Sequence, residues 1–305
     1  MYHFIVNPSS SSGRGSMLWK EIEKKLIARQ IPYLVYMTDG EGAARRYAQE
    51  ITAGDDEVTI VVCGGDGTMN EVVCGIRDYE KVTLACIPTG SSNDLARDFG
   101  IPSDPMKMID IALNPTKIVK MDIGRIAHGE GGKNFAVSMG VGFDAAICHE
   151  ALNSKIKDAL NKIKLGKLTY LGISLKQLAG AKNVGATILL DDDKEVKVDN
   201  LLFVTCMVHR YEGGGFMFCP TADYSDGYLD ILTVGDISKL KILQILPTAT
   251  KGKHIGNAGI NLYKAKKVVI KTEQPMPVHV DGESAGVRDE VTVTQEEKQV
   301  NLILG

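Results

Sequence analysis

The stretch VCGGDGTMNEVV, residues 62–73, joins an apolar run to a helical pattern through three glycines and one aspartate. Glycine-rich turns between a strand and a helix usually bind phosphate, because bare backbone N–H groups and the positive helix N-terminus attract anions. Asp66 should repel such a ligand, since an unperturbed aspartate is ionised at neutral pH. A divalent cation between the two negative groups is the simplest solution. The stretch therefore raises the question whether the rest of the chain supplies a metal-nucleotide site and an acceptor for a phosphoryl group.

The length and composition of the chain indicate an ordinary globular protein. Its 305 residues are enough for a sizeable core and predict two domains. Hydrophobic residues make up 44% and charged residues 24%, and the formal net charge is -3. This balance argues against a dedicated nucleic-acid binder.

The cysteines and the N-terminus predict a cytoplasmic protein. Six cysteines are scattered without a C-x-x-C pair, as expected of reduced, buried thiols. The first residues, MYHFIVNPSSSSGRG, have no basic leader, and no apolar run approaches the length of a membrane span. Any membrane contact is therefore expected to be peripheral.

The first 123 residues alternate short apolar runs with helical patterns, which is typical of a parallel sheet covered by helices. The predicted strands are 2–6, 33–37, 58–63, 82–88 and 116–124, and the predicted helices are 16–30, 41–51, 68–76, 93–99 and 105–113. We expect residues 1–123 to form a doubly wound α/β domain. Ligands of such sheets bind beyond the carboxyl ends of the strands.

The pattern changes after Ile123. A hairpin signal at 129–133 is followed by β-rich runs at 134–142, 184–190, 198–208, 228–234, 266–272 and 276–282. Short strands separated by Gly and Asp turns predict a mostly antiparallel β-sandwich over residues 124–290. The tail, residues 291–305, is predicted to be a strand that packs back on the N-terminal domain or on the second one.

Three loops follow strands of the predicted parallel sheet. NPSSSSGRGS (7–16) lacks the lysine of a Walker loop, but its serines and glycines could still surround phosphate groups, or form an ordinary turn. In GGDGT, Asp66 has no evident packing role, and a structural Asx-type turn is the alternative. In PTGSSNDLAR (88–97), Asp94 either belongs to the site or caps the next helix.

These motifs, with GFDA (142–145), GGGFMFCPTADYSDGYLDI (213–231) and DGE (281–283), resemble the diacylglycerol kinase catalytic-domain family. The resemblance is to its bacterial lipid kinases related to sphingosine kinases. The matches follow in order from Asn7 to Glu283, nearly the whole chain. A lone GGDGT would be less specific, because NAD kinases share it.

The resemblance implies a reaction. Members transfer the γ-phosphoryl group of ATP to a lipid hydroxyl with Mg²⁺, using an N-terminal nucleotide domain and a C-terminal β-sandwich. We expect diacylglycerol as the acceptor, giving phosphatidic acid; a sphingoid base, an isoprenoid alcohol or another glycerolipid are alternatives. Positioning and charge neutralisation carry most of such a transfer.

The resemblance also implies roles for residues. ATP is expected to bind Asn7, Pro8, Ser9, Ser10, Ser11, Thr38, Gly64, Gly65, Gly67, Thr68, Met69, Asn70, Glu71, Thr89, Asn93 and Asp94. Asp66 is expected to be catalytic, in an acidic, Mg²⁺-linked network with Asp94 and Asp122. Glu283 matches the general base, although its position also suits a surface turn.

A second metal site is implied by TADYSDGYLD, residues 221–230. It resembles the family's structural Mg²⁺ loop, in which Asp223, Asp226 and the backbone carbonyl of Tyr228 supply oxygen ligands. Oxygen ligation suits Mg²⁺. The alternative is a plain Asp-Gly turn, since the EF-hand spacing is absent.

The sequence departs from the family at two places. Ser91-Ser92 stands where relatives commonly have Thr-Gly or Thr-Glu, and His209-Arg210 stands where many have Asn-Gly. The second change adjoins the expected acceptor side and bears on acceptor identity. We interpret His209 as a hydrogen-bonded structural histidine, with catalysis as the alternative.

Residues 151–183 are locally basic. They hold seven lysines (155, 157, 162, 164, 167, 176 and 182) and one acid, Asp158, interleaved with apolar residues. The segment is typical either of an amphipathic surface on anionic lipid or of a solvated helix face.

The expected partner is therefore a lipid at a membrane surface, with no nucleic acid, and a homodimer is left open. A soluble kinase of the NAD kinase type is the enzymatic alternative. PTGSSNDLAR and the block from GGG to DG argue against it. A non-catalytic lipid or nucleotide binder is the other alternative. Such a protein is expected to have lost site carboxylates, yet this sequence keeps Asp66, Asp94, Asp226 and Glu283.

Overall fold

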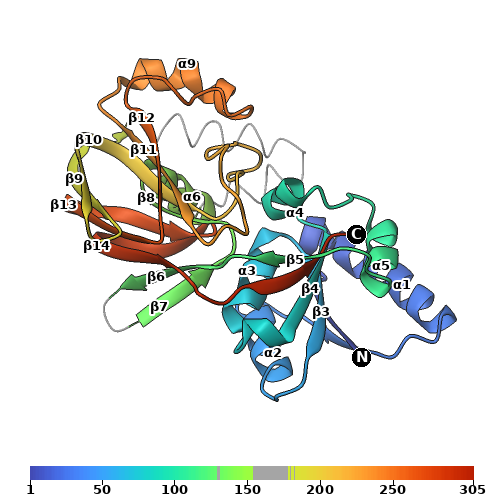
Figure 1. The fold of residues 1–305 in the computed structure, drawn as a ribbon. Coiled ribbons are helices and arrows are strands. Elements are labelled where there is room, and N and C mark those ends of the chain that lie inside the picture. The colour runs from blue at the N-terminus through green and yellow to red at the C-terminus, as the bar shows by residue number, and fades with distance from the viewer. Residues whose placement is uncertain (129–130, 154–177, 179, 182) are drawn as a thin grey trace.

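Two β-sheets, one in each half of the chain, form the framework of this protein in a computed structural model (Figure 1). The structure describes residues 1–128, 131–153, 178, 180, 181 and 183–305. The N-terminal sheet is mostly parallel and covered by helices, and the second is antiparallel. The predicted combination of an α/β domain and a β-sandwich is confirmed.

The first sheet has the strand order β2-β1-β3-β4-β15-β5. Its strands are β1 (Tyr2–Val6), β2 (Tyr33–Met37), β3 (Val58–Gly64), β4 (Val82–Pro88), β5 (Ile118–Met121) and β15 (Val300–Ile303). All run parallel except β5, which is antiparallel to β15. The chain moves from β1 outward to β2 and then to β3 on the other side of β1. The ends of β1 and β3 therefore form the switch point where doubly wound sheets bind ligands.

Helices cover both faces of this sheet. They are α1 (Ser10–Ala28), α2 (Ala43–Ile51), α3 (Asp66–Gly75), α4 (Asp94–Phe99) and α5 (Pro105–Leu113), with a 3-10 turn η1 (Tyr79–Lys81). α1 and α5 lie on one face, and α2 and α3 on the other (Figure 1). Central strands β3 and β4 are almost wholly apolar and buried, because both of their faces are covered.

The second sheet contains nine strands. They are β6 (Gly124–His128), β7 (Gly131–Phe135), β8 (Ser138–Gly142), β9 (Val184–Leu190), β10 (Lys194–Met207), β11 (Leu229–Gly235), β12 (Ile260–Ala265), β13 (Lys267–Val280) and β14 (Glu283–Gln295). Each of the long strands β10 and β13 pairs with β9 through its first half and with β8 through its second. This double pairing folds the sheet over an apolar core that includes Phe135, Ile188 and Val278.

Some predicted boundaries differ from the structure. Residues 266–272 and 276–282 belong to one strand, β13, whose register against β14 shifts between Lys271 and Met276. Pro275 lies within the shift; proline has no N–H for a ladder. Residues 134–142 are divided between β7 and β8, with Ala136 and Val137 between them.

The C-terminal residues contribute to both sheets. β14 ends at Gln295 in the second sheet, and β15 lies between β4 and β5 in the first. Leu302 and Ile303 are buried in the N-terminal core. The last strand thus completes the first sheet although it is farthest from it in sequence.

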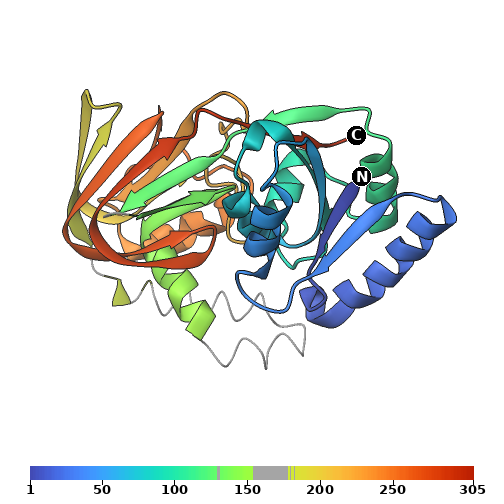
Figure 2. The same cartoon turned by 90° about the horizontal axis from the view of Figure 1, so that it is seen from below.

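Among the described elements, α6 (Phe143–Asn153) follows β8, and α9 (Lys239–Ala249) lies on the outer side of the second sheet (Figures 1 and 2). The seven lysines between 155 and 182 lie outside the described residues. Among the described helices, none is both long and apolar enough to cross a bilayer.

We predict that Leu302→Ala lowers the free energy of unfolding by about 2–5 kcal/mol, because it leaves a cavity between β4 and β5. Val287→Ala is the control, since this side chain is exposed and should cost less than about 0.5 kcal/mol. Urea unfolding measures both. Equal effects would contradict the position of β15 in the core.

Candidate active site

The loops that follow β1, β3 and β4 meet at one edge of the first sheet. The Asn7 amide donates to Thr68 Oγ1 at 3.2 Å, and the Thr89 hydroxyl donates to Ser10 Oγ at 2.8 Å. The Ser11 hydroxyl donates to the Thr89 carbonyl at 2.5 Å. Parallel strands end at the same edge, so three loops far apart in sequence form a single polar surface.

Glycines leave the backbone of this surface bare. Gly65 and Gly90 cross so closely that a Cβ on Gly65 would lie 2.9 Å from the Gly90 Cα. A Cβ on Gly67 would meet nothing within 4 Å, so the chain is open there. The N-termini of α1 and α3 point to the same edge, and both attract anions. The arrangement therefore fits a phosphate-bearing ligand.

Asp66 has a packing partner that its sequence context does not reveal. Its carboxylate accepts the backbone N–H groups of Asp94 at 3.0 Å and of Leu95 at 3.2 Å, at the start of α4. Burial raises the pKa of Asp66, while these N–H groups oppose the shift. Asp66 thereby fixes the helix that carries Asp94.

Asp94 links the two halves of the molecule. Its side chain is almost fully buried, forms an ion pair with Arg97 and accepts the Gly214 N–H at 2.7 Å. Burial raises the pKa of Asp94 to about 6, with a further contribution from the charge of Asp66 and opposition from Gly214 and Arg97. Two carboxylates thus lie beside each other with little surrounding positive charge, a setting that favours a cation.

A second carboxylate of α4 also binds the sandwich. Asp98 Oδ2 lies 2.8 Å from His209 Nδ1, and Oδ1 accepts the Arg210 Nε–H at 2.5 Å. Burial disfavours the Asp98 carboxylate, but the hydrogen bonds and charges of His209 and Arg210 hold its pKa below the usual value. The unusual His209-Arg210 pair therefore joins β10 to α4, and His209 is hydrogen-bonded as interpreted.

Other residues expected at the nucleotide have mainly structural contacts. Met69 lies in the N-terminal core, and the Asn70 amide nitrogen is buried without a partner among the described residues. Both Glu71 oxygens accept backbone N–H groups at the start of α2, from Gly42 and Ala44, each at 3.0 Å. Glu71 thus caps a helix.

The remaining expected residues lie in the loops themselves. Pro8 and Ser9 lie between β1 and α1, where the Ser9 N–H donates to Asn7 Oδ1 at 3.0 Å. The Thr38 N–H donates to the Val6 carbonyl at 2.9 Å, which places Thr38 beside the end of β1. Gly64 packs on Thr68, and Asn93 exchanges two hydrogen bonds with Gly90.

Glu283 lies apart from the Asp66–Asp94 pair. It begins β14 and forms an ion pair with Lys133 of β7. Burial raises the pKa of the Cys74 thiol to about 12, and the charges of Asp281 and Glu283 add to the effect. Glu283 is therefore near Cys74, in the C-terminal half of α3. Asp66 starts that helix eight residues earlier, about 12 Å along its axis.

Asp281, two residues before Glu283, holds the backbone between β7 and β8 in place. Its carboxylate accepts the N–H groups of Ala136, Val137 and Ser138 at 2.8–2.9 Å. Asp281 has a φ of 46° and Gly282 a φ of 80°, so the turn into Glu283 has two successive left-handed residues. This turn fixes where the Glu283 side chain starts.

The acidic residues of the expected Mg²⁺ loop are already paired with a lysine side chain from β12. Lys264 Nζ lies 2.5 Å from Asp226 Oδ2 and 3.5 Å from Asp230 Oδ2. Asp223 accepts hydrogen bonds from Ser225, and the Tyr228 N–H donates to Asp226 Oδ1. The oxygen donors suit Mg²⁺, but a metal at Asp226 would compete with the ammonium of Lys264.

Asp122 belongs to this loop rather than to the Asp66–Asp94 pair. It accepts the Gly227 N–H at 2.8 Å and the Gln299 amide at 2.6 Å. Burial raises the pKa of Asp122, and the charges of Asp226 and Asp223 add to the shift.

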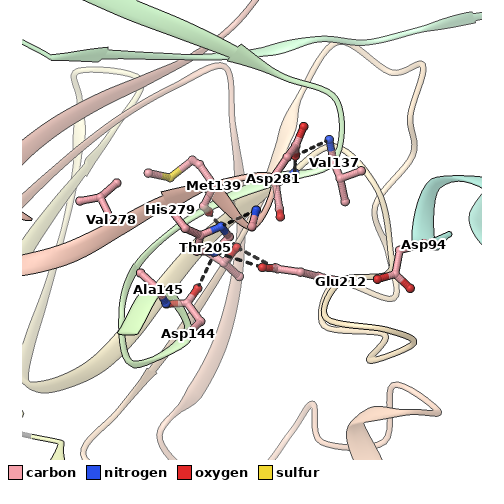
Figure 3. A network of polar contacts seen from close by, with 12 residues as sticks. Asp94, Val137, Met139, Asp144, Ala145, Thr205, Glu212, Val278, His279 and Asp281 are labelled. Carbon is pink, nitrogen blue, oxygen red and sulfur yellow. Dashed lines mark hydrogen bonds and ion pairs between the residues drawn. The ribbon is translucent and has the colours of Figure 1, made fainter. Parts of the chain in front are cut away.

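Three further side chains converge in the sandwich domain: Asp144, Glu212 and His279 (Figure 3). His279 Nε2 lies 3.2 Å from Asp144 Oδ2 and 3.0 Å from Glu212 Oε1, and all three groups are nearly buried. Thr205 also faces Glu212 but already donates to the Met139 carbonyl at 2.8 Å. Two carboxylates therefore share one N–H donor.

The backbone decides which ring nitrogen carries that hydrogen. The Gly282 N–H donates to His279 Nδ1 at 3.3 Å, so Nε2 bears the proton. A metal at Nε2 would have to displace this proton. The proton would then have to sit on Nδ1, where the Gly282 N–H already points. The carboxylates and histidine could ligate a divalent ion by type, but this hydrogen bond favours a proton-sharing cluster.

Comparison with known proteins agrees with this geometry. Residues 1–126 match the family model of the diacylglycerol kinase catalytic domain, and residues 138–302 match the YegS C-terminal NAD kinase beta sandwich-like domain. A diacylglycerol kinase of Mycobacterium tuberculosis (strain ATCC 25618 / H37Rv) is 31% identical over 252 residues, 81% of this chain and 76% of the relative. The chain belongs to the diacylglycerol kinase family. The resemblance inferred from the motifs is confirmed, and with it a phosphotransferase with an alcohol acceptor.

Solved structures of this family and of NAD kinases share the fold. A diacylglycerol kinase from Bacillus anthracis str. Sterne superposes with a TM-score of 0.71 at 22% identity, over 100% of this chain and 96% of that one. An NAD kinase from Archaeoglobus fulgidus, solved in complex with ATP, gives 0.55 at 14% identity, over 99% and 93% of the two chains. The fold alone therefore does not separate lipid from NAD acceptors.

Sequence reasoning missed several residues of this region: Arg97, Lys133, Asp144, Glu212 and His279. Arg97 had a signal, because it lies one helical turn after Asp94. Asp144 lies in the GFDA motif, and Glu212 directly precedes the glycine triplet. No local pattern marks Lys133 or His279, because their partners Glu283 and Asp144 are more than a hundred residues away.

We predict losses of stability of very different size for two changes in the Asp144–Glu212–His279 cluster. His279→Leu should destabilise the protein by about 3–5 kcal/mol, because it leaves two carboxylates without their shared donor. Glu212→Gln should cost less than about 1 kcal/mol, since it removes a charge and adds a donor. Urea unfolding at pH 7 checks both. A large loss of stability in Glu212→Gln would contradict the view that the two carboxylates lack hydrogen-bond donors.

Proposed function

We propose that this protein transfers the γ-phosphoryl group of ATP to a lipid hydroxyl with Mg²⁺, and that diacylglycerol is the acceptor. One observation carries the proposal. Asp66 and Asp94 lie together at the strand ends of the first sheet, and Gly214 of the sandwich domain donates to Asp94. A reaction between a nucleotide on one half and an acceptor on the other would take place there. Membership of the diacylglycerol kinase family supports the lipid acceptor.

ATP would bind across the bare strand edge. The open backbone at Gly67 offers hydrogen bonds to phosphate oxygens. The hydroxyls of Ser10, Ser11 and Thr89 lie at the same edge and would each turn from their present acceptors to donate to the phosphate. The N-termini of α1 and α3 add favourable electrostatics. The wider set expected from the family, from Asn7 to Asp94, remains part of this proposal.

Mg²⁺ would be held by Asp66 and Asp94, because among the described residues Arg97 is the one ion-pair partner that the two buried carboxylates have. When bound, it supplies charge neutralisation for the phosphate oxygens. Asp223, Asp226 and the Tyr228 carbonyl remain the proposed structural Mg²⁺ ligands. Their donor types fit, subject to competition with Lys264.

Glu283 is the proposed general base. Its ion pair with Lys133 holds the carboxylate at the start of β14, and the Asp281–Gly282 turn orients it. An acceptor hydroxyl that replaces Lys133 as hydrogen-bond donor could then pass its proton to Glu283.

The location and assembly of the protein are part of the same proposal. We propose a cytoplasmic enzyme that contacts the membrane peripherally, divided near residue 123 into a nucleotide domain and an acceptor domain. A homodimer stays a prediction that light scattering would test.

The main test is transfer of labelled γ-phosphate from ATP to diacylglycerol in mixed micelles, with Mg²⁺ or EDTA. Asp66→Asn and Glu283→Gln should each lower the rate by about 10²–10⁴-fold, because one loses charge at the metal and the other the base. Asp55→Asn and Glu290→Gln are matched controls, since both side chains are well exposed on the surface. Metal-independent labelling, or full activity of either site variant, would contradict the mechanism.

The metal loop has its own test. Lys264→Met removes the ammonium that competes for Asp226, so Mg²⁺ should raise the melting temperature of this variant more than that of the wild type. Lys271→Met is the control, because Lys271 pairs with Glu290 on the surface, away from the metal loop. An identical Mg²⁺ response of Lys264→Met and wild type would argue against metal binding at the loop.

A further inference from the structure

Helix α9 has apolar residues on its outward face as well as on its buried one. Ile242, Ile245 and Ala249 are buried in the sandwich domain. On the opposite face Leu240 is 68% exposed and Leu243 is 39% exposed. Pro247, also exposed, continues the same stripe at helical spacing, beside the polar Gln244. A helix on a protein surface normally presents polar residues outward, so this stripe lacks a partner within the described residues.

The surroundings of this stripe are strongly basic. Residues 237–259, which form α9 and the turns on either side of it, contain four lysines and no aspartate or glutamate, in a chain whose net charge is -3. Lys241, Lys251 and Lys253 are exposed next to the apolar stripe. Positive charge beside exposed leucines is complementary to a surface that is apolar inside and negative outside.

The same helix is tied to the candidate active site. The Met217 N–H donates to the Ala249 carbonyl at the end of α9, at 2.9 Å, and His254 Nε2 lies 3.1 Å from the Phe218 carbonyl. Phe216 and Phe218 stack with ring centroids 5.5 Å apart. Three residues before Met217, Gly214 donates to Asp94. One continuous loop therefore connects α9 with the carboxylates of α4.

We propose that the outward face of α9 docks on an anionic lipid bilayer. Leu240 and Leu243 enter the interfacial region, and the lysines at 241, 251 and 253 contact anionic headgroups. The inference rests on the proposed lipid acceptor and deepens it, because it says which face meets the membrane. Docking there brings the bilayer next to the loop of residues 213–220, through which the acceptor would approach Asp94.

A second copy of the chain fits this face poorly. In a two-fold interface the same patch meets itself, so three lysines would face three lysines without an acid nearby. The exposed apolar residues of α1 differ from this stripe, because lysines and acids are interleaved on that helix. Met17 and Ile27 of α1, for example, lie ten positions apart on a helix that also carries Glu21 and Glu23.

Vesicle sedimentation tests the proposal on the full chain. The vesicles are phosphatidylcholine with or without phosphatidylglycerol. Leu240→Gln with Leu243→Gln, and separately Lys241→Gln with Lys251→Gln and Lys253→Gln, should each lower binding to the anionic vesicles by about tenfold or more. Met17→Gln with Ile27→Gln should leave binding within about twofold. Unfolding midpoints and light scattering verify that each variant is folded and of unchanged mass.

Activity separates this proposal from the proposed function. Against a short-chain, water-soluble diacylglycerol, the α9 variants should retain wild-type turnover, while turnover of diacylglycerol embedded in vesicles should fall with binding. Unchanged vesicle binding in both α9 variants would overturn the docking proposal even if lipid is phosphorylated. A change of molecular mass in the variants, with no change in vesicle binding, would overturn it in favour of a contact between copies. If wild type phosphorylates neither diacylglycerol, the proposed function fails, and sedimentation still decides about docking.

Discussion

The two halves of the molecule depend on the carboxylates of one short helix, α4. Asp98 is buried against His209 and Arg210, and Asp94 accepts the Gly214 amide. Burying a carboxylate is costly unless it accepts hydrogen bonds or pairs with a cation. His209, Arg210 and Gly214 come from the sandwich domain, so burial of the two carboxylates is favourable only in this relative position of the two halves. Asp66 caps the start of the same helix. The edge of the first sheet, α4 and the glycine loop of the sandwich therefore form one connected unit.

This unit explains why acids gather where a phosphate would bind. Asp66 and Asp94 are fixed by backbone hydrogen bonds and not by lysines or a second arginine, so the site keeps a demand for positive charge. On the sandwich side, the Asp144–Glu212–His279 cluster also has more carboxylates than donors, because one His279 nitrogen lies between two of them (Figure 3). Glu212 also starts the loop that reaches Asp94, so the cluster positions one end of that loop. A phosphoryl-transfer site needs such preorganised charge more than it needs covalent chemistry.

Local sequence was sufficient for the strands around residues 62–73, because apolar runs and glycine turns have short-range physical causes. It also located the three strand-end loops. It could not place β15, whose partners β4 and β5 lie some two hundred residues earlier, nor show that Glu71 caps α2. The Lys264–Asp226 pair, likewise, is set by the pairing of β11 with β12 and leaves no spacing signal. The expected catalytic role of Asp66 and the general-base role of Glu283 rest on family resemblance. The structure shows no contact between the two carboxylates that would connect them in one site.

The fold is shared with NAD kinases, so the acceptor is the central claim. The most direct measurement offers both acceptors at once: labelled ATP, Mg²⁺, NAD and diacylglycerol in micelles, followed by extraction into organic solvent. The account predicts that label appears in the organic phase as phosphorylated lipid, with none in NADP. Label in NADP alone would contradict the lipid acceptor while leaving the fold and the nucleotide edge intact.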